Sequence, residues 1–115
     1  NEKLLKTDEK IVELMDRYKR ININDTSRWS NQGAMFTRQL WNMLQLARVI
    51  TQGAYNRNES RGAHYKPEFP ERNDEDWLKT TVASFDKENN KPVFRYDEVD
   101  TSLIEPRKRD YSKSK

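Results

Sequence analysis

The segment from Met35 to Tyr55 restricts the fold of this chain more than any other. Its apolar residues recur at spacings of three and four, which places them on one face of an α-helix. That face carries Phe36, Leu40, Met43, Leu44, Ala47, Ile50 and Ala54. Trp41, Leu46 and Val49 extend the apolar surface around the helix. Because a helix that is apolar on more than one side is usually central, we expect this helix to lie in the middle of the fold.

Short polar side chains before the central helix predict where it begins. Residues 22–32 are rich in Asn, Asp, Ser and Thr, with Trp29 among them, which is typical of a loop leading into a helix cap. We expect Ser30 or Asn31 to be that cap. Gly53, inside the helix, costs about 1 kcal/mol relative to alanine. It therefore either marks a close approach to a neighbouring backbone or is simply tolerated.

The rest of the chain shows three further patterns. From Leu4 to Ile21 the apolar residues again have helical spacing, which predicts an amphipathic helix. After Gly62, two prolines and an acidic cluster predict an extended loop and then a short helical turn capped by Asp74. The β-branched and aromatic residues of 79–85 and 93–96 predict a β-hairpin. The expected fold class is mainly α.

The composition indicates one small domain with a thin core. The chain has 115 residues, of which 33% are hydrophobic and 36% are charged. This leaves little apolar area to offset the entropy of ordering the chain. Two kinds of structure fit this composition. One is a set of long helices with one solvent-exposed face, and the other is a piece of a larger protein whose partner covers part of its surface. Since the first residue is Asn1, we expect the chain to have been processed or cut from something longer.

Charge and cysteine content weigh against several classes of protein. The 22 Lys and Arg residues nearly balance 19 Asp and Glu residues, so the net charge of +3 is a weak argument for nucleic-acid binding. The chain has no cysteine, which removes disulfides and Cys-ligated zinc and is compatible with a reducing compartment. No apolar run approaches the roughly 18 residues needed to cross a bilayer. We also find no secretory signal.

Residues that could carry chemistry are few. His64 is the single histidine, so we expect it to hydrogen-bond at a helix end rather than to bind a metal. Ser60 lies four positions before it, but across a glycine this is local geometry rather than a catalytic triad. The acidic residues of 71–76 lie in a polar loop, where we expect ordinary pKa values and a role at a helix N-terminus. Three glycines in all form no phosphate-binding loop, so we expect no standard site for FAD, NAD or ATP.

The block from Arg57 to Tyr65 collects most of the remaining polar groups. Gly62 fits the position just beyond a helix C-terminus, where glycine accepts a positive φ cheaply. Arg57 and Arg61 would then lie in the last helical turn, where the helix dipole favours cations. The Glu59 carboxylate and the Arg61 guanidinium are candidates for ion pairs with neighbours or across an interface. These residues predict a helix end and a charged cluster, and they do not predict an enzyme.

Four ordered stretches stand out as motifs. They are Asn58-Glu59-Ser60-Arg61-Gly62-Ala63-His64-Tyr65, Phe69-Pro70-Glu71-Arg72-Asn73-Asp74-Glu75-Asp76-Trp77-Leu78, Leu40-Trp41-Asn42-Met43-Leu44-Gln45-Leu46-Ala47 and Pro106-Arg107-Lys108-Arg109-Asp110-Tyr111. The first two resemble the end of the helical domain in the succinate dehydrogenase and fumarate reductase flavoprotein family, and the third is similar to its last long helix. The fourth resembles the basic, Tyr-ended tail of succinate dehydrogenases, which makes fumarate reductases and L-aspartate oxidases second choices. The resemblance covers nearly the whole chain.

This resemblance implies a spectrin-repeat-like three-helix bundle followed by a small β-hairpin and a basic tail. It divides the chain into a helical part (1–78), a hairpin (79–98) and a tail (99–115), all within one structural domain of a larger subunit. The family's domain usually opens with a further helix before Leu4, so the bundle is expected to be short of its first helix. Apolar surface from Ile11, Tyr18 or the central helix would then be exposed and would drive self-association.

The resemblance also implies a parent subunit that oxidises succinate to fumarate with covalently held FAD, in the tricarboxylic acid cycle and electron transport. The family's catalytic and flavin-linked residues lie upstream and none maps here, so we expect no catalytic, cofactor-binding or metal residue and no activity in the isolated chain. The expected interdomain or structural residues are Glu59, Arg61, Gly62, His64 and Arg72. The implied partners are the FAD domain of the same subunit and an iron-sulfur subunit, with no nucleic acid and only indirect membrane contact. The implied location is the cytoplasmic face of a bacterial membrane, or the matrix side in mitochondria.

An alternative is a free-standing basic helical protein that binds other proteins or nucleic acid. It is motivated by the isoelectric point near 9.2 and by the basic tail. It predicts strongly salt-dependent binding to DNA or RNA that is lost on truncation after Ile104. The mixed charge along the rest of the chain argues against it.

Overall fold

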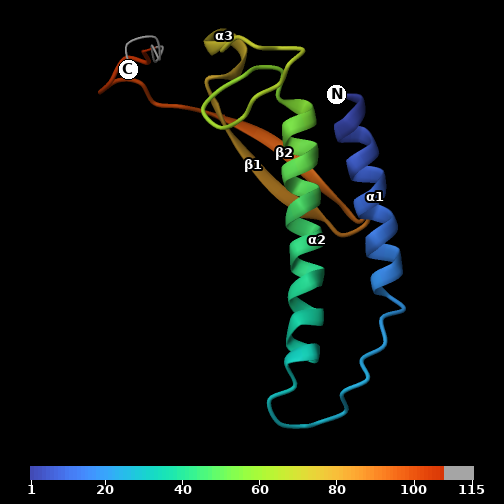
Figure 1. Cartoon of the computed structure of the whole chain (residues 1–115). Helices are drawn as coiled ribbons and strands as arrows, with labels where there is room; N and C mark the ends of the chain where they lie inside the picture. Colours follow the sequence, from blue (N-terminus) through green and yellow to red (C-terminus); the bar gives the residue numbers. More distant parts are fainter. Residues whose placement is uncertain (108–115) are drawn as a thin grey trace, which may run out of the picture.

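The computed structural model describes residues 1–107 and places two long helices side by side, joined by a long loop (Figure 1). Helix α1 spans Glu2–Tyr18 and helix α2 spans Gln32–Asn56. A single turn, α3 (Asp74–Trp77), precedes the strands β1 (Lys79–Asp86) and β2 (Lys91–Glu98). Within residues 1–107 the fold therefore has three helices and one antiparallel hairpin. The prediction of a mainly α fold with a hairpin is confirmed, although the third helix is only one turn long.

The core is small and lies between α1 and α2. Ile11 and Met15 from α1 and Leu44 from α2 are buried, and Leu14, Tyr18, Trp41 and Ala47 pack around them. The Tyr18 and Trp41 rings lie 5.0 Å apart between centroids. Of the surfaces expected to be exposed, Ile11 is buried against the second helix, whereas apolar side chains of the central helix are exposed. No helix in the described part of the chain is both long and apolar enough to span a membrane.

Polar contacts fix the start of α2 and the register of the helix pair. Asn31 caps α2, because its side chain accepts a hydrogen bond of 2.8 Å from the Ala34 N–H. One of the two predicted caps is thus confirmed. Asp8 accepts hydrogen bonds from Arg48 Nε at 3.2 Å and Gln52 Nε2 at 2.9 Å. These two contacts connect α1 to the second half of α2.

The cap of α3 is Asn73, whose side chain accepts from the Asp76 N–H at 3.1 Å. The prediction of Asp74 as the cap was therefore wrong by one residue. The reason is that the Asp74 carboxylate is already taken by two arginines, Arg61 and Arg72.

The hairpin is regular and rests on α2. Its pairing runs from Lys79 opposite Glu98 to Asp86 opposite Lys91, which confirms the predicted hairpin. At Gly53, an added Cβ would lie 3.5 Å from the Phe94 ring. The close approach at this glycine is thus to a side chain of β2 rather than to a neighbouring backbone.

Only part of the apolar face predicted for the central helix packs against α1. Leu44 is buried, but Phe36 is 58% exposed, Met43 63% and Ile50 70%. Helix α1 packs along the flank of this face that contains Leu44 and Thr51. The strongest apolar pattern in the sequence therefore lies largely in the open.

Candidate functional site

The block after α2 is organised around Glu59, which has no exposed surface. Glu59 Oε1 accepts hydrogen bonds from Arg57 Nε at 2.8 Å and Arg61 Nε at 2.9 Å. Oε2 accepts from Arg61 Nη2 at 2.9 Å and from the Asn73 backbone N–H at 3.1 Å. Burial alone would raise the pKa of Glu59, but hydrogen bonds from Arg61, Asn73 and Arg57 outweigh it and lower that pKa. The carboxylate is therefore held ionised in a buried place.

Arg57 connects this carboxylate to two other elements. It follows Asn56 as the C-cap residue of α2, so the prediction that it lies in the last helical turn was wrong. Its guanidinium donates to the carbonyl oxygen of Trp77 at 2.5 Å and to Thr81 Oγ1 at 3.1 Å. It also lies 5.5 Å from the centre of the Trp77 ring, within the range of a cation–π contact. One side chain thus joins the end of α2 to α3 and β1.

A second carboxylate, Asp74, extends the cluster to its surface. Arg61 Nη2 donates to Asp74 Oδ1 at 2.6 Å, and Arg72 donates to both Asp74 oxygens from Nε and Nη2. These hydrogen bonds, first from Arg72 and then from Arg61, lower the pKa of Asp74 to about 2. The prediction of an ordinary pKa was wrong for Asp74, because two guanidinium groups bind it. Arg72 also donates to the carbonyl oxygen of Arg107 at 2.8 Å.

Gly62 occupies a tight turn rather than a helix end. Arg61 and His64 exchange backbone hydrogen bonds of 2.8 and 3.0 Å, and Gly62 lies between them with φ +60°. Glycine with positive φ at the first central position is typical of a type II′ turn. The positive φ agrees with the sequence reading, but α2 ends at Asn56, well before Gly62. Arg61 likewise lies beyond the helix.

Ser60 and His64 make separate contacts. Ser60 Oγ donates to the carbonyl oxygen of Phe69 at 2.8 Å and accepts from the Lys66 N–H at 2.9 Å. His64 Nε2 lies 3.2 Å from the carbonyl oxygen of Arg57. Both side chains therefore bind backbone groups of this block.

The sequence reading missed Lys66, whose side chain is 2% exposed. Its ammonium donates to the carbonyl oxygens of Tyr55 at 2.7 Å and Ala54 at 3.3 Å, and to Asn58 Oδ1 at 2.8 Å. These are unpaired carbonyls at the C-terminus of α2, where the helix dipole also favours a cation. Burial lowers the pKa of Lys66. No spacing rule could have found this contact, because a loop carries Lys66 back to the helix end.

The cluster is suited to holding elements together. The Glu59 and Asp74 carboxylates are both kept ionised, so they serve ion pairing better than proton transfer near neutral pH. Among residues 1–107, no group of three or more His, Cys, Asp or Glu side chains is arranged to hold a metal ion. The cluster therefore cross-links α2, the Gly62 turn, α3 and β1.

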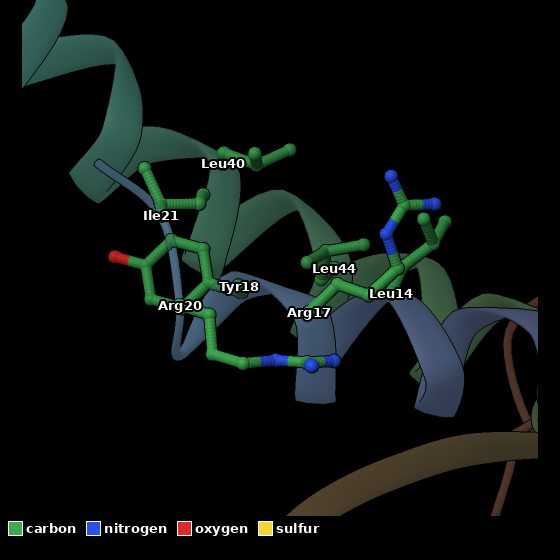
Figure 2. Close-up of a pocket in the computed structure, with 7 residues that line it drawn as sticks. All are labelled: Leu14, Arg17, Tyr18, Arg20, Ile21, Leu40 and Leu44. Atoms are coloured by element: carbon green, nitrogen blue, oxygen red, sulfur yellow. The ribbon is translucent and has the colours of Figure 1, made fainter. Parts of the chain in front are cut away.

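A groove also lies between α1 and α2 (Figure 2). It has a volume of about 520 Å³, and its lining consists of Leu14, Arg17, Tyr18, Arg20, Ile21, Leu40 and Leu44. Arg20 is paired with Asp16 at 3.5 Å. The walls are mostly apolar and offer few polar groups to orient a small substrate. The groove is better suited to an apolar side chain of another helix than to a small substrate.

Comparison with known proteins gives matches along the whole chain. The sequence model of the family described as "Fumarate reductase flavoprotein C-term" matches residues 1–111. The chain is 73% identical over 115 residues to the succinate dehydrogenase flavoprotein subunit of Bacillus subtilis, covering 100% of this chain and 20% of that protein. It is 41% identical over 103 residues to the fumarate reductase flavoprotein subunit of Haemophilus influenzae, covering 90% of this chain and 17% of that protein.

Two solved structures that superpose on this chain are of fumarate reductases. A solved structure of E. coli quinol fumarate reductase superposes with a TM-score of 0.84 at 34% identity, over 91% of this chain and 18% of that chain. A second structure, of quinol-fumarate reductase with menaquinol molecules, superposes with a TM-score of 0.81 at 33% identity. The chain thus spans about a fifth of the length of the relatives it matches.

Proposed function

Because the chain belongs to the succinate dehydrogenase and fumarate reductase flavoprotein family and matches its C-terminal domain, we propose that it is the non-catalytic C-terminal domain of a succinate dehydrogenase flavoprotein subunit. The parent subunit would oxidise succinate to fumarate with FAD and pass electrons to an iron-sulfur subunit at the cytoplasmic face of the membrane. The 73% identity to a succinate dehydrogenase subunit, against 41% to a fumarate reductase subunit, supports the choice between the two enzymes.

The observation that carries the non-catalytic role is the Glu59 cluster. Its polar groups are directed at one another and at backbone carbonyls, as the contacts of Arg57, Arg61 and Lys66 with their partners illustrate. A catalytic group has to reach a substrate. The hydrogen-bonding atoms of these groups instead bind partners within the chain and so join α2 to α3 and the hairpin. We assign Glu59, Arg61, Gly62, His64 and Arg72 to maintaining the shape of the domain and its junction with the parent.

The shape of the domain supports a role as part of a larger body. Its radius of gyration is 19.1 Å, whereas a compact chain of this length has about 13 Å. The buried hydrophobic residues among positions 1–107 are Ile11, Met15 and Leu44, which is a small core for the number of residues ordered. We propose that the FAD domain of the same subunit covers part of the remaining apolar surface.

Two preparations test this function: the 115-residue chain and the full-length subunit that contains it. We expect the chain alone to retain no flavin absorbance and to reduce no dye with succinate, while the full-length subunit does both. Turnover by the pure 115-residue chain would contradict the proposal.

A substitution in the full-length subunit tests the structural role of Glu59. We expect Glu59→Gln to lower the yield of folded, flavin-loaded subunit and to leave the turnover per bound flavin unchanged. Glu9→Gln, at an exposed position of α1, is the matched control and should change neither quantity. Normal flavin content with lost turnover in Glu59→Gln would place Glu59 in catalysis instead.

A further inference from the structure

The β-hairpin crosses α2 and is attached to the helices in different ways at its two ends (Figure 1). At the base, where β1 begins, the Arg57 guanidinium donates to the carbonyl oxygen of Lys79 at 3.4 Å and to Thr81 Oγ1 at 3.1 Å. The same guanidinium binds the buried carboxylate of Glu59. The base of the hairpin is therefore joined to the Glu59 cluster.

The turn at the other end of the hairpin is held by Arg48, which lies in the second half of α2. Arg48 Nη1 donates to the carbonyl oxygen of Asn90 at 2.8 Å, and Asn90 lies between the paired ends Asp86 and Lys91. Arg48 Nε donates to Asp8 Oδ1 of α1 at 3.2 Å. One guanidinium therefore binds α1 and the hairpin turn at the same time.

The packing beneath the turn half of the hairpin is loose. The Phe94 ring lies against Gly53 of α2 midway along the strands. Nearer the turn, an open pocket of about 430 Å³ separates α2 from the hairpin, and its lining includes Trp41, Leu46, Val49, Phe85 and Pro92. Unfilled space removes dispersion contacts, and a two-stranded hairpin without packing is marginally stable in water. The position of the turn therefore depends strongly on the hydrogen bond from Arg48.

Asp8 controls where the Arg48 guanidinium lies. The side chain of Arg48 is 15% exposed and that of Asp8 is 22% exposed, so the pair is largely withdrawn from water, where a charge-assisted hydrogen bond is strong. With Nε bound to Asp8, the planar guanidinium presents Nη1 to Asn90. Without the carboxylate, a long basic side chain gains by turning its charged end toward water. The turn would then lose its donor.

We propose that Arg48 is a latch that makes the docking of the hairpin turn depend on the pairing of α1 with α2. While α1 lies against α2, Asp8 holds Arg48 toward Asn90, and the hairpin stays closed over the pocket. Displacement of α1 releases Arg48, and the turn half of the hairpin moves away from α2. The base stays in place through Arg57, so the hairpin moves as a strap hinged at the Glu59 cluster. This inference goes beyond the proposed function and does not rest on it.

Hydrogen exchange measured by mass spectrometry in the full-length subunit tests the latch. Asp8→Asn keeps the size of the side chain and removes its charge, on a helix that precedes the hairpin by about 70 residues. We expect amides of residues 86–93 to exchange about fivefold faster or more, while those of residues 79–82 keep their rates. Glu9→Gln, at an exposed neighbouring position of α1, is the matched control and should change neither region. Unchanged exchange at the turn in Asp8→Asn overturns the proposal.

A double-mutant cycle distinguishes the latch from a general loosening of the helix pair. Arg48→Met keeps the apolar stem and removes both hydrogen bonds, so it should speed exchange at the turn as Asp8→Asn does. If Asp8 acts through Arg48, adding Asp8→Asn to Arg48→Met should produce no further increase at residues 86–93. Effects that multiply in the double variant would mean that Asp8 acts independently of Arg48, and they would overturn the proposal. Circular dichroism of each variant should show that the helices remain folded.

Discussion

The buried carboxylate of Glu59 is bound by three different residues. Its oxygens bind Arg57, Arg61 and the backbone of Asn73. Glu59→Gln keeps the shape but leaves two guanidinium groups without their anion, and breaking a buried pair costs about 3 kcal/mol or more. We expect urea denaturation of the isolated chain to show a fall of that size in the free energy of unfolding. Glu9→Gln should change it by less than about 0.5 kcal/mol, and equal losses in both variants would contradict the special role of Glu59.

Lys66 supplies the cation at the end of α2. Lys66→Met preserves length and apolar contact but leaves the carbonyls of Tyr55 and Ala54 unpaired in a buried place. An unsatisfied buried acceptor costs about 1–3 kcal/mol, so we expect faster native-state amide exchange in the last turn of α2 and a loss of stability in that range. Lys6→Met, at a lysine whose side chain is 71% exposed, is the control. An unchanged exchange rate in Lys66→Met would show that the ammonium does not hold the helix end.

Asp74 makes the stability depend on acid pH. Arg72 and Arg61 lower its pKa from 3.8 to about 2 in the folded chain, so the unfolded chain binds this proton more readily. The contribution to stability is complete above the unfolded pKa and is lost as the pH falls through about 2. The urea midpoint, measured between about pH 5 and about pH 2, should therefore fall, and it should fall less in Asp74→Asn. Identical pH profiles in the two chains would rule out Asp74 as the source.

At the scale of the elements, replacing each of two glycines by alanine should change the stability of the chain in opposite directions. Gly62 has φ +60° and no atom within 4 Å of an added Cβ, so Gly62→Ala is strained by the backbone alone, at a cost of about 1–2 kcal/mol. Gly53 lies inside α2, and its added Cβ would meet the Phe94 ring at an ordinary contact distance of 3.5 Å. Gly53→Ala should therefore stabilise the chain by up to about 1 kcal/mol. Thermal unfolding of both variants measures this, and destabilisation by Gly53→Ala would show that the ring cannot accommodate a methyl group.

At the scale of the whole molecule, the charge is unevenly placed. Residues 105–115 hold five of the 22 basic and two of the 19 acidic residues, so they carry the whole net charge of +3 and residues 1–104 are neutral. Structural detail for residues 108–115 lies outside the described part of the chain. The basic tail is therefore the element on which nucleic-acid binding would have to depend.

Fluorescence anisotropy with a short DNA duplex tests that alternative. We expect the intact chain to bind only weakly and only at low salt, because few phosphate contacts are available. Truncation after Ile104 should remove even this binding. Tight binding at physiological salt that is lost on truncation after Ile104 would favour the nucleic-acid alternative.

The sequence by itself determined the features that depend on near neighbours. The periodicity of residues 35–55 and the polar run ending at Asn31 specify α2, since helix spacing and capping involve residues within four positions. The alternating β-branched residues of 79–96 specify the hairpin for the same reason. The motif from Asn58 to Leu78 was enough to indicate the family. Gly62 was correctly expected to have a positive φ, but its turn was mistaken for a helix end because both environments favour glycine.

Only the tertiary structure decided which groups meet across long stretches of chain. It turned the flank of α2 that carries Leu44 toward α1 and left much of the predicted apolar face exposed, because Asp8 and Met15 of α1 pack against that flank. It placed Lys66 at the end of α2 and two guanidinium groups on Asp74, which changed the pKa of that carboxyl from the value expected for a loop. Burial and ion pairing depend on distances in space, and residue spacing along a chain does not contain them.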